Sequence, residues 1–422
     1  MPKEWKRANI IPIPKATDWG MDIDKTRPIT LLETLRKIFT KILTNRIEEI
    51  CRKSDILKGN NCSVLKGTST HCPINIIKNL LEDVNTSQNG ELWLVLQDMR
   101  KAFDSVGWSS LERALTRIKM NRKYIAIMRD LHLNRKSSVI TAYGPTSPHH
   151  VQDGLDQGEI HAPILWRIFY DPLLCAVGKL TTSTGYYMQP IPNTPSPGIN
   201  HLAFVDDTAW IANSKSSMTK ILETADTFFK VNDIEINKQK TVCILCRGKK
   251  NRTNNSETTT DDSTIRFGDS HITISPANVS HRYLGIWISG NNSPSLVYSK
   301  LRQEILNING AFHNKPVTDK MAAYITNAVT LPVIEYRTKG TFLTSNHSTQ
   351  LTNDIKRTLR KKFNLSRETA AKTIHHPDFY NIPTVTDILI TARTSELLYD
   401  LNSPNIEGAF TRHRLKQMQY HA

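Results

Sequence analysis

The sequence predicts an α+β protein, in which a domain built on an antiparallel sheet precedes a helical domain. Two observations support this fold class. Through the first 290 residues, short apolar runs typical of strands alternate with helical patterns, and turn residues interrupt the alternation with short hairpins. Residues 295–401 are mostly helical in pattern and strongly basic.

The N-terminal segment predicts one hairpin and two helices. Residues 8–15 and 27–32 are apolar and are joined by a polar loop with glycine and aspartate, which is typical of a β-hairpin. Apolar residues recur near helical spacing through 32–54 and predict an amphipathic helix; they are Leu35, Ile38, Phe39, Ile42, Leu43, Ile47 and Ile50. A second helix is expected over 72–85.

The middle of the chain continues the alternation. A strand over 91–97 runs toward a helix that starts near Ser109, and residues 113–135 have a helical pattern. The other predicted elements are a strand at 137–144, a helix at 160–180, a Pro- and Gly-rich surface connection at 181–200, a strand at 201–212, a helix at 215–230, a strand at 241–246 and a short strand at 280–289. Residues 247–264 are nearly devoid of apolar side chains and predict a mobile loop, and the C-terminal 412–422 is expected to be disordered.

The charge of the chain favours a polyanionic partner. Lysine and arginine number 55 against 39 aspartates and glutamates, so the net charge is +16. No apolar run approaches the roughly 20 residues that cross a bilayer, and the N-terminus lacks the apolar core of a signal peptide. Nucleic acid is therefore the expected partner, ahead of an acidic membrane.

The six cysteines indicate a reducing compartment, because this number in a chain of 422 residues does not suggest a disulfide framework. Cys243 and Cys246 form a CxxC pair, but they lie in the apolar segment TVCILC, and no second pair stands at zinc spacing. We interpret them as part of a buried strand.

Two adjacent carboxylates, Asp206 and Asp207, interrupt the apolar segment HLAFVDDTAWIA. Neighbouring ionised carboxylates repel each other and are costly to bury without a partner. Either the pair caps a surface turn, or a strongly positive group lies beside it.

Another carboxylate, Asp98, follows the apolar run 92–96. It could cap a following helix. Alternatively, it converges with Asp206 and Asp207 from a neighbouring strand, and the three carboxylates bind two Mg²⁺ ions. Two such ions are the usual device for in-line phosphoryl transfer, so this alternative predicts nucleotidyl chemistry.

The motifs LQDMRKAFDSV, GLDQGEIHAPILWRIFYDPL, FVDD, INKQKT and YLG occur in this order, after an opening WKRANIIPIPK…TRPITLL. This order resembles the reverse transcriptases of LINE-type (non-LTR) retrotransposons over most of residues 1–290. The resemblance implies a right-hand polymerase fold with a two-Mg²⁺ centre, which copies an RNA template by extending a DNA primer with dNTPs. It also implies a fragment without the endonuclease, and a nuclear site of action.

The resemblance assigns roles to individual residues around that centre. Asp98 and Asp206 match the first and second metal ligands, and Asp207 is the third carboxylate, in the turn of a hairpin. Lys240 matches the lysine that protonates the leaving pyrophosphate, although Lys238 is an alternative. The segment Tyr283, Leu284 and Gly285 resembles the primer grip.

Other matches concern the incoming nucleotide. Phe103 matches the bulky residue that excludes a ribose 2′-OH. Gln157 and Gly158 match the pair beside the templating base, where glycine permits close backbone approach. Lys15 and Arg27, at the facing ends of the opening hairpin, match the basic residues that grip the triphosphate.

The resemblance also implies a division into domains: fingers over 1–90 and 113–150, palm over 91–112 and 151–290, thumb over 291–400, and a basic tail over 401–422. Basic residues in 352–368 and 410–418 would hold the heteroduplex. The segment EIH after Gly158 departs from the family pattern, and the two acids in DGLDQG are expected to weaken triphosphate binding. The alternatives are an inactive RNA-binding protein of the same fold, and an RNA-dependent RNA polymerase, against which Phe103 argues.

Overall fold

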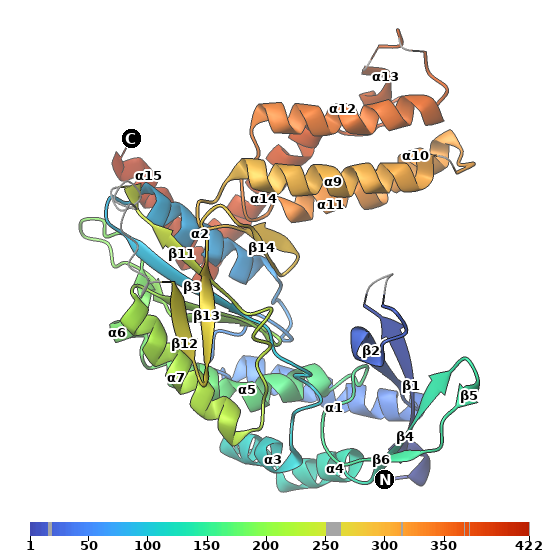
Figure 1. Ribbon diagram of the computed structural model, residues 1–422, viewed down its shortest axis with the longest axis vertical. Helices are drawn as coiled ribbons and strands as arrows, with labels where there is room; N and C mark the ends of the chain where they lie inside the picture. Colours follow the sequence, from blue (N-terminus) through green and yellow to red (C-terminus); the bar gives the residue numbers. More distant parts are fainter. Residues whose placement is uncertain (16–18, 250–262, 314, 367, 371, 422) are drawn as a thin grey trace.

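A six-stranded sheet forms the centre of the molecule, in a computed structural model that describes residues 1–15, 19–249, 263–313, 315–366, 368–370 and 372–421. The strand order is β12-β13-β11-β3-β10-β9 (Figure 1). The strands are β3 (Glu91–Gln97), β9 (His201–Phe204), β10 (Asp207–Ala212), β11 (Val242–Arg247), β12 (Thr264–Phe267) and β13 (Ser270–Ser275). Each neighbouring pair is antiparallel except β11 and β13, so the predicted antiparallel sheet is confirmed, with one parallel pair.

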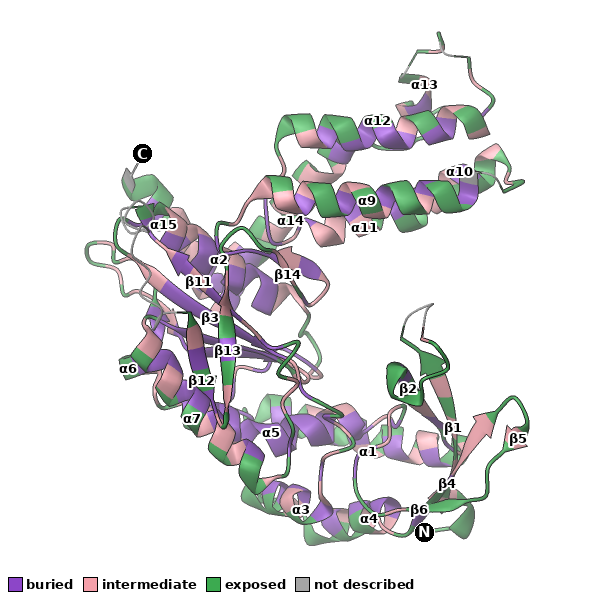
Figure 2. Ribbon diagram, viewed as in Figure 1, coloured by how far each residue is buried: buried purple, intermediate pink, exposed green. Residues whose placement is uncertain are grey.

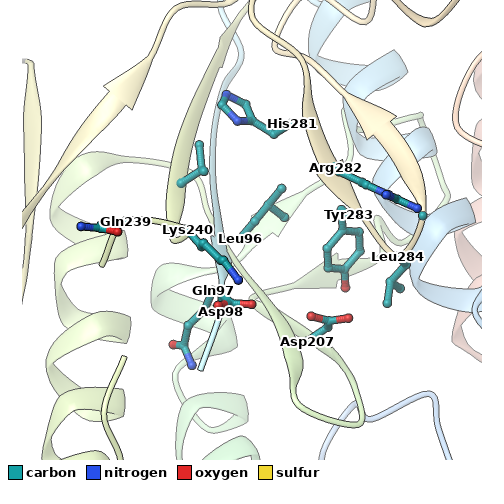
Figure 3. Close-up of a pocket in the computed structure, with 12 residues that line it drawn as sticks. Leu96, Gln97, Asp98, Asp207, Gln239, Lys240, His281, Arg282, Tyr283 and Leu284 are labelled. Carbon is teal, nitrogen blue, oxygen red and sulfur yellow. The ribbon is translucent and has the colours of Figure 1, made fainter. Parts of the chain in front are cut away.

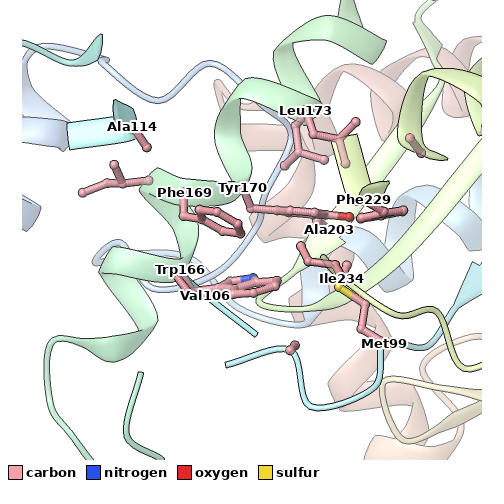
Figure 4. Packing of buried hydrophobic residues seen from close by; sticks show 14 of the residues in the cluster. Met99, Val106, Ala114, Trp166, Phe169, Tyr170, Leu173, Ala203, Phe229 and Ile234 are labelled. Carbon is pink, nitrogen blue, oxygen red and sulfur yellow. The ribbon is translucent and has the colours of Figure 1, made fainter. Parts of the chain in front are cut away.

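The central strand β3 is buried on both faces because helices cover both sides of the sheet. Trp93 and Val95 belong to a core with α5 (Ala162–Gly178) and α7 (Lys215–Val231), part of which Figure 4 shows. Leu92, Leu94 and Leu96 belong to a second core that includes α2 (His71–Thr86). Burial of each large apolar side chain contributes roughly 1.5–3 kcal/mol. The end of β3 is therefore a firm support for the residue that follows it.

A smaller sheet lies at the N-terminal side of the molecule (Figure 1). It contains β1 (Arg7–Pro14), β2 (Thr26–Leu31), β4 (Arg135–Thr141), β5 (Gly144–Pro145) and β6 (His149–Val151). The predicted opening hairpin is confirmed by the antiparallel β1–β2 pair. The single helix expected over 113–135 is two helices, α3 (Trp108–Arg117) and α4 (Arg122–His132), because the chain turns at Lys119, whose φ is 56°.

Helix α1 (Thr34–Lys53) is present where the sequence predicts it, but only part of its predicted apolar face, Phe39, Leu43 and Ile47, packs on the core. Arg36 and Thr40 are buried, whereas Leu35, Ile38 and Ile42 are 62%, 54% and 49% exposed (Figure 2). The reason is that the buried face of α1 pairs with carboxylates of the 153–161 loop, and the sequence pattern does not reveal such partners.

Residues 181–200 are more ordered than the predicted surface connection. They form the short helix α6 (Thr181–Thr184) and the strand pair β7 (Tyr186–Tyr187) and β8 (Gly198–Ile199). Met188 and Ile199 are buried in the second core. The expected short strand at 280–289 is a hairpin of β14 (His281–Tyr283) and β15 (Ile286–Ile288). Most of the expected mobile loop at 247–264 lies outside the described residues.

The helical domain has its own hydrophobic core, as expected from residues 295–401. The helices are α9 (Pro294–His313), α10 (Asp319–Ile325), α11 (Leu331–Arg337), α12 (Ser345–Lys362), α13 (Lys372–His375) and α14 (Val385–Asn402). None of the helices among the described residues combines the length and the apolar character needed to span a bilayer.

The prediction of a disordered basic C-terminus is wrong. Residues Ile406–His421 form α15, which packs beside α2 (Figure 1). Phe410 is fully buried there, and Gln417 Nε2 donates to Asp83 Oδ1 at 2.7 Å. Arg412 donates to the backbone carbonyls of Leu401 and Ser403, so this basic side chain is used in a contact within the protein. The apolar and polar partners on α2 lie more than 300 residues away, and the local sequence cannot reveal them.

Candidate active site

A cavity of about 430 Å³ lies where β3 ends and β10 begins (Figure 3). Four segments of the chain meet around it: the end of β3, the start of β10, the loop before β11, and the β14–β15 hairpin. The lining residues are Leu96, Gln97, Asp98, Asp207, Gln239, Lys240, Val242, His281, Arg282, Tyr283, Leu284 and Gly285.

Asp98 and Asp207 stand at the same end of two paired strands. Gln97 of β3 lies opposite Thr208 of β10, so each carboxylate is the next residue beyond this pair. The backbone of Asp98 is anchored, since its N–H donates to Thr241 Oγ1 at 3.3 Å and its carbonyl accepts from the N–H of Asn237 at 2.9 Å. The next helix, α3, starts ten residues later, so Asp98 is not a helix cap.

Asp206 lies in the two-residue turn between β9 and β10, as the turn interpretation of the Asp-Asp pair expected. It does not line the cavity. Its carbonyl accepts from Thr208 Oγ1 at 3.2 Å, and Tyr170 Oη lies 3.1 Å from the same hydroxyl. The turn is thus tied to the core beneath it.

The three carboxylates influence one another electrostatically. Partial burial removes water from Asp207, and the charges of Asp206 and Asp98 add to this effect, so that the pKa of Asp207 rises to about 6. Burial and the charge of Asp98 also raise the pKa of Asp206. The end of the β3–β10 pair is therefore a site where carboxylates repel one another.

A cation would relieve this repulsion. No three histidine, cysteine, aspartate or glutamate side chains stand close enough to hold one metal ion within the described part of the chain. Two of the expected ligands, Asp98 and Asp207, line the cavity, while Asp206 lies beside it in the turn. Carboxylate oxygens are nevertheless the ligands that Mg²⁺ prefers, so the chemistry of these side chains suits a divalent cation.

Lys240 lines the cavity together with these carboxylates, and in Figure 3 its ammonium end points toward Asp98. Its backbone N–H donates to the carbonyl of Asn237 at 3.2 Å, in the same loop that anchors Asp98. Lys238 is not among the lining residues. Of the two lysines that the sequence left open, the geometry favours Lys240.

The turn of the β14–β15 hairpin forms the opposite wall of the cavity. Leu284 and Gly285 have φ values of 45° and 84°, so this is a tight turn with both central residues in the left-handed region. Tyr336 Oη donates to the Leu284 carbonyl at 2.7 Å, and Arg337 donates to the Gly285 carbonyl. Residues of α11 therefore set the position of this hairpin.

The residues expected to contact the nucleotide do not line this cavity. Phe103 is half-buried and packs against Trp166, with ring centroids 5.6 Å apart. Gln157 accepts a hydrogen bond from the Thr30 N–H at 2.7 Å through its carbonyl. Gly158 has a φ of 115°, and a Cβ there would lie 2.8 Å from the Thr30 carbonyl oxygen, so this position requires glycine.

Lys15 and Arg27 are both exposed on the opening hairpin and do not reach the cavity. The Lys15 ammonium donates to the Asp24 carbonyl at 3.1 Å. The carboxylate of Asp24 lies 3.9 Å from Lys101 Nζ, so the hairpin loop approaches the segment that follows Asp98. The structure thus brings together Asp98, Asp207, Lys240 and the 283–285 turn in one cavity, which Phe103, Gln157, Gly158, Lys15 and Arg27 do not line.

Of the acids around Gln157, Asp156 and Glu159 belong to ion pairs, whereas Asp153 is exposed. Asp156 pairs with Arg135, and Glu159 lies 2.6 Å from Arg36 Nη2, with both side chains of this second pair almost fully buried. Asp153 accepts from the N–H of Trp108 at the start of α3. The charges of Asp156 and Glu159 are thus partnered within the protein, and the weakening of triphosphate binding by these acids stays a prediction.

Several residues around the cavity were not predicted. Gln239, His281 and Arg282 line it and are neighbours of predicted residues, so their place in the sequence offered a signal. Tyr336 and Arg337 act through the 283–285 turn from more than 50 residues away. No local pattern could have identified these two.

Comparisons with known proteins agree with this geometry. Residues 13–288 match the family "Reverse transcriptase (RNA-dependent DNA polymerase)". The chain is 27% identical over 254 residues to a "Retrovirus-related Pol polyprotein from type-1 retrotransposable element R2" of Popillia japonica, which covers 58% of this chain and 33% of that protein. It is 26% identical over 175 residues to a "Probable RNA-directed DNA polymerase from transposon BS" of Drosophila melanogaster, which covers 41% of this chain and 19% of that protein. The matches therefore span a third or less of these relatives.

Among solved structures, apo telomerase from Candida tropicalis is 14% identical, with a TM-score of 0.44, over 97% of this chain and 69% of that one. The family match covers more than half of the chain and includes the residues that line the cavity, the three carboxylates and the six-stranded sheet. The chain belongs to the reverse transcriptase (RNA-dependent DNA polymerase) family.

Proposed function

We propose that the chain is an RNA-directed DNA polymerase, which extends a primer 3′-OH with dNTPs on an RNA template. One observation carries this proposal: in a chain of the reverse transcriptase family, Asp98 and Asp207 meet in one cavity with Lys240 and the 283–285 turn. The net charge of +16 supports a nucleic-acid partner. The relatives from retrotransposons R2 and BS support a retrotransposon origin.

In the proposed reaction, the primer 3′-OH releases its proton to water, its oxygen bonds to the α-phosphorus, and the bond from the α-phosphorus to the leaving pyrophosphate breaks. Asp98, Asp206 and Asp207 would hold two Mg²⁺ ions, which activate the attacking oxygen and offset charge on the leaving group. Lys240 donates a proton to the pyrophosphate. The 283–285 turn holds the primer end against the carboxylates.

The residues outside the cavity would bind the incoming nucleotide. Phe103 lies over its sugar and excludes a 2′-OH, while Gln157 and Gly158 lie beside the templating base. Lys15 and Arg27 bind the triphosphate when the opening hairpin approaches the cavity. The short distance between Asp24 and Lys101 supports this approach, because it brings the hairpin loop near the segment after Asp98.

We assign fingers to 1–90 and 113–150, palm to 91–112 and 151–290, and thumb to 291–400. Basic residues in 352–368 would contact the heteroduplex backbone, which predicts affinity that falls with salt. The assignment of 401–422 as a basic tail is replaced by α15, an integral helix. Nuclear action at chromosomal DNA follows from the same analogy with retrotransposons.

The test is primer extension on an RNA template with dNTPs and Mg²⁺. We expect wild-type synthesis and a loss of about 10³-fold or more in Asp206→Asn, because several kcal/mol of transition-state stabilisation are removed. Asp378→Asn is the matched control, since Asp378 is 86% exposed at its side chain and lies in the helical domain.

Other outcomes separate the alternative functions. If wild type and Asp206→Asn both bind the hybrid but neither extends the primer, the chain is a binding protein of this fold. If NTPs are incorporated as readily as dNTPs, the chain is an RNA-dependent RNA polymerase, and the role of Phe103 is wrong.

A further inference from the structure

The turn that carries Asp206 has an unfavourable backbone conformation. Val205, its first central residue, has a φ of 58°, in the left-handed region that β-branched residues rarely adopt. Turns of this kind normally have glycine at that position. Such a conformation costs about 1–3 kcal/mol and persists when surrounding contacts enforce it.

Three side chains hold the backbone of Val205. Its N–H donates to Ser63 Oγ at 3.0 Å. Its carbonyl accepts from Trp166 Nε1 at 2.9 Å and from Asn61 Nδ2 at 3.3 Å. The Ser63 hydroxyl also donates to Asn61 Oδ1, which orients the Asn61 amide toward Val205. Both polar groups of the strained residue are therefore satisfied by the protein.

These three side chains are themselves rigid. Asn61, Ser63 and Trp166 are 4%, 1% and 0% exposed. The segment 59–63 runs beside β9, where the Cys62 N–H donates to the Ala203 carbonyl at 2.8 Å. Arg167 of α5 donates to the Ser63 carbonyl, so the segment and Trp166 are supported by the same helix.

We propose that Ser63, Asn61 and Trp166 are positioning residues, which hold Val205 in its left-handed conformation and so fix the turn that places Asp207 in the wall of the cavity and Asp206 beside it. The proposal rests on the proposed polymerase function for its effect on catalysis. The hydrogen bonds of these three side chains to Val205 form a clamp, and this clamp is a property of the fold. Because Trp166 also packs against Phe103, the same side chain connects the carboxylate turn to the proposed sugar-binding residue.

Ser63→Ala removes two hydrogen bonds, the one that Ser63 Oγ accepts from the Val205 N–H and the one that it donates to Asn61, whereas Trp166→Phe removes the single bond to the Val205 carbonyl. We expect faster amide hydrogen exchange in the peptide 201–212, and Mn²⁺ affinity, measured by electron paramagnetic resonance, lower by about 10–100-fold. We expect kcat to fall by up to about 10²-fold with little change in the KM for dNTP, since the reacting groups are misplaced.

Matched controls separate positioning from general destabilisation. Ser348→Ala removes a buried hydroxyl in α12, and Trp108→Phe removes the hydrogen bond that a buried indole N–H in α3 donates to Glu112. Both controls should leave exchange in 201–212 and Mn²⁺ affinity unchanged. Unchanged exchange and Mn²⁺ affinity in Ser63→Ala and Trp166→Phe would overturn the proposal.

Replacement of Val205 by glycine provides a rescue experiment. Glycine adopts a φ near 58° without steric cost, so the turn no longer depends on the clamp. We expect Val205→Gly to restore most of the Mn²⁺ affinity that Ser63→Ala loses, and absence of any rescue would contradict the role of backbone strain. If wild type extends no primer, the polymerase proposal fails, while exchange and Mn²⁺ binding still decide the positioning proposal.

Discussion

Substitution of Arg36 by methionine should destabilise the protein strongly, because Arg36 is the centre of a buried ion network. Its guanidinium lies 2.6 Å from Glu159 and 3.7 Å from Asp156, and its side chain is 1% exposed. It also donates to the Trp5 carbonyl. Arg135, also buried, is the second cation beside Asp156, so two arginines balance two carboxylates.

The distances allow the size of the effect to be estimated. At an effective dielectric constant of about 20, unit charges 2.6 Å apart attract by roughly 6 kcal/mol. Desolvation offsets much of this attraction in the intact pair. In Arg36→Met the Glu159 carboxylate stays buried without its partner, and such a change typically costs about 3–5 kcal/mol. We expect a loss of this size in the free energy of unfolding.

The assay is urea unfolding of Arg36→Met compared with Arg46→Met, an exposed arginine on the same helix. The control should change the free energy of unfolding by no more than about 0.5 kcal/mol. The double variant Arg36→Met/Glu159→Leu should cost much less than the sum of the two single changes, because it leaves no unpaired charge. Equal effects of Arg36→Met and Arg46→Met would refute the reasoning.

Three further predictions follow from other regions. Gly158→Ala should lower the melting temperature more than Gly144→Ala. Both glycines have a positive φ, but a Cβ at Gly158 would lie 2.8 Å from a backbone oxygen, whereas a Cβ at Gly144 would meet open space. Equal shifts of the melting temperature would contradict this reasoning. Phe410→Ala should cost about 3–5 kcal/mol in urea unfolding if α15 is an integral helix, against a small change for the exposed Met418→Ala. Partial burial and the charges of Asp206 and Asp98 raise the pKa of Asp207 to about 6. Its ionised form therefore destabilises the folded state above that pH. This penalty disappears as the pH falls toward the unfolded-state pKa of about 4. Asp207→Asn should therefore melt at a higher temperature than wild type at pH 7.5 in EDTA, with the advantage lost near pH 4, and a constant difference across this range would contradict the assignment.

The sequence by itself determined the local elements and the order of the motifs. The apolar run before Asp98 predicts a buried strand, and it is one because both faces of β3 are covered. The Asp206–Asp207 pair predicts a turn, which the β9–β10 hairpin contains. Cys243 and Cys246 lie buried in β11, as their apolar context predicts. These features depend on neighbours a few residues away, so a local pattern can reveal them.

The tertiary structure decided which of these elements meet. It pairs β3 with β10, more than 100 residues later, and so places Asp98 and Asp207 in one cavity. It buries the polar face of α1 against Glu159 and folds the basic C-terminus into α15 against α2. Hydrophobic periodicity indicates that a helix face is apolar, but it does not indicate whether another element covers that face. Likewise, a charged residue in the sequence does not indicate which residue far along the chain is its counter-ion. The contacts that hold the proposed site in place are of this long-range kind.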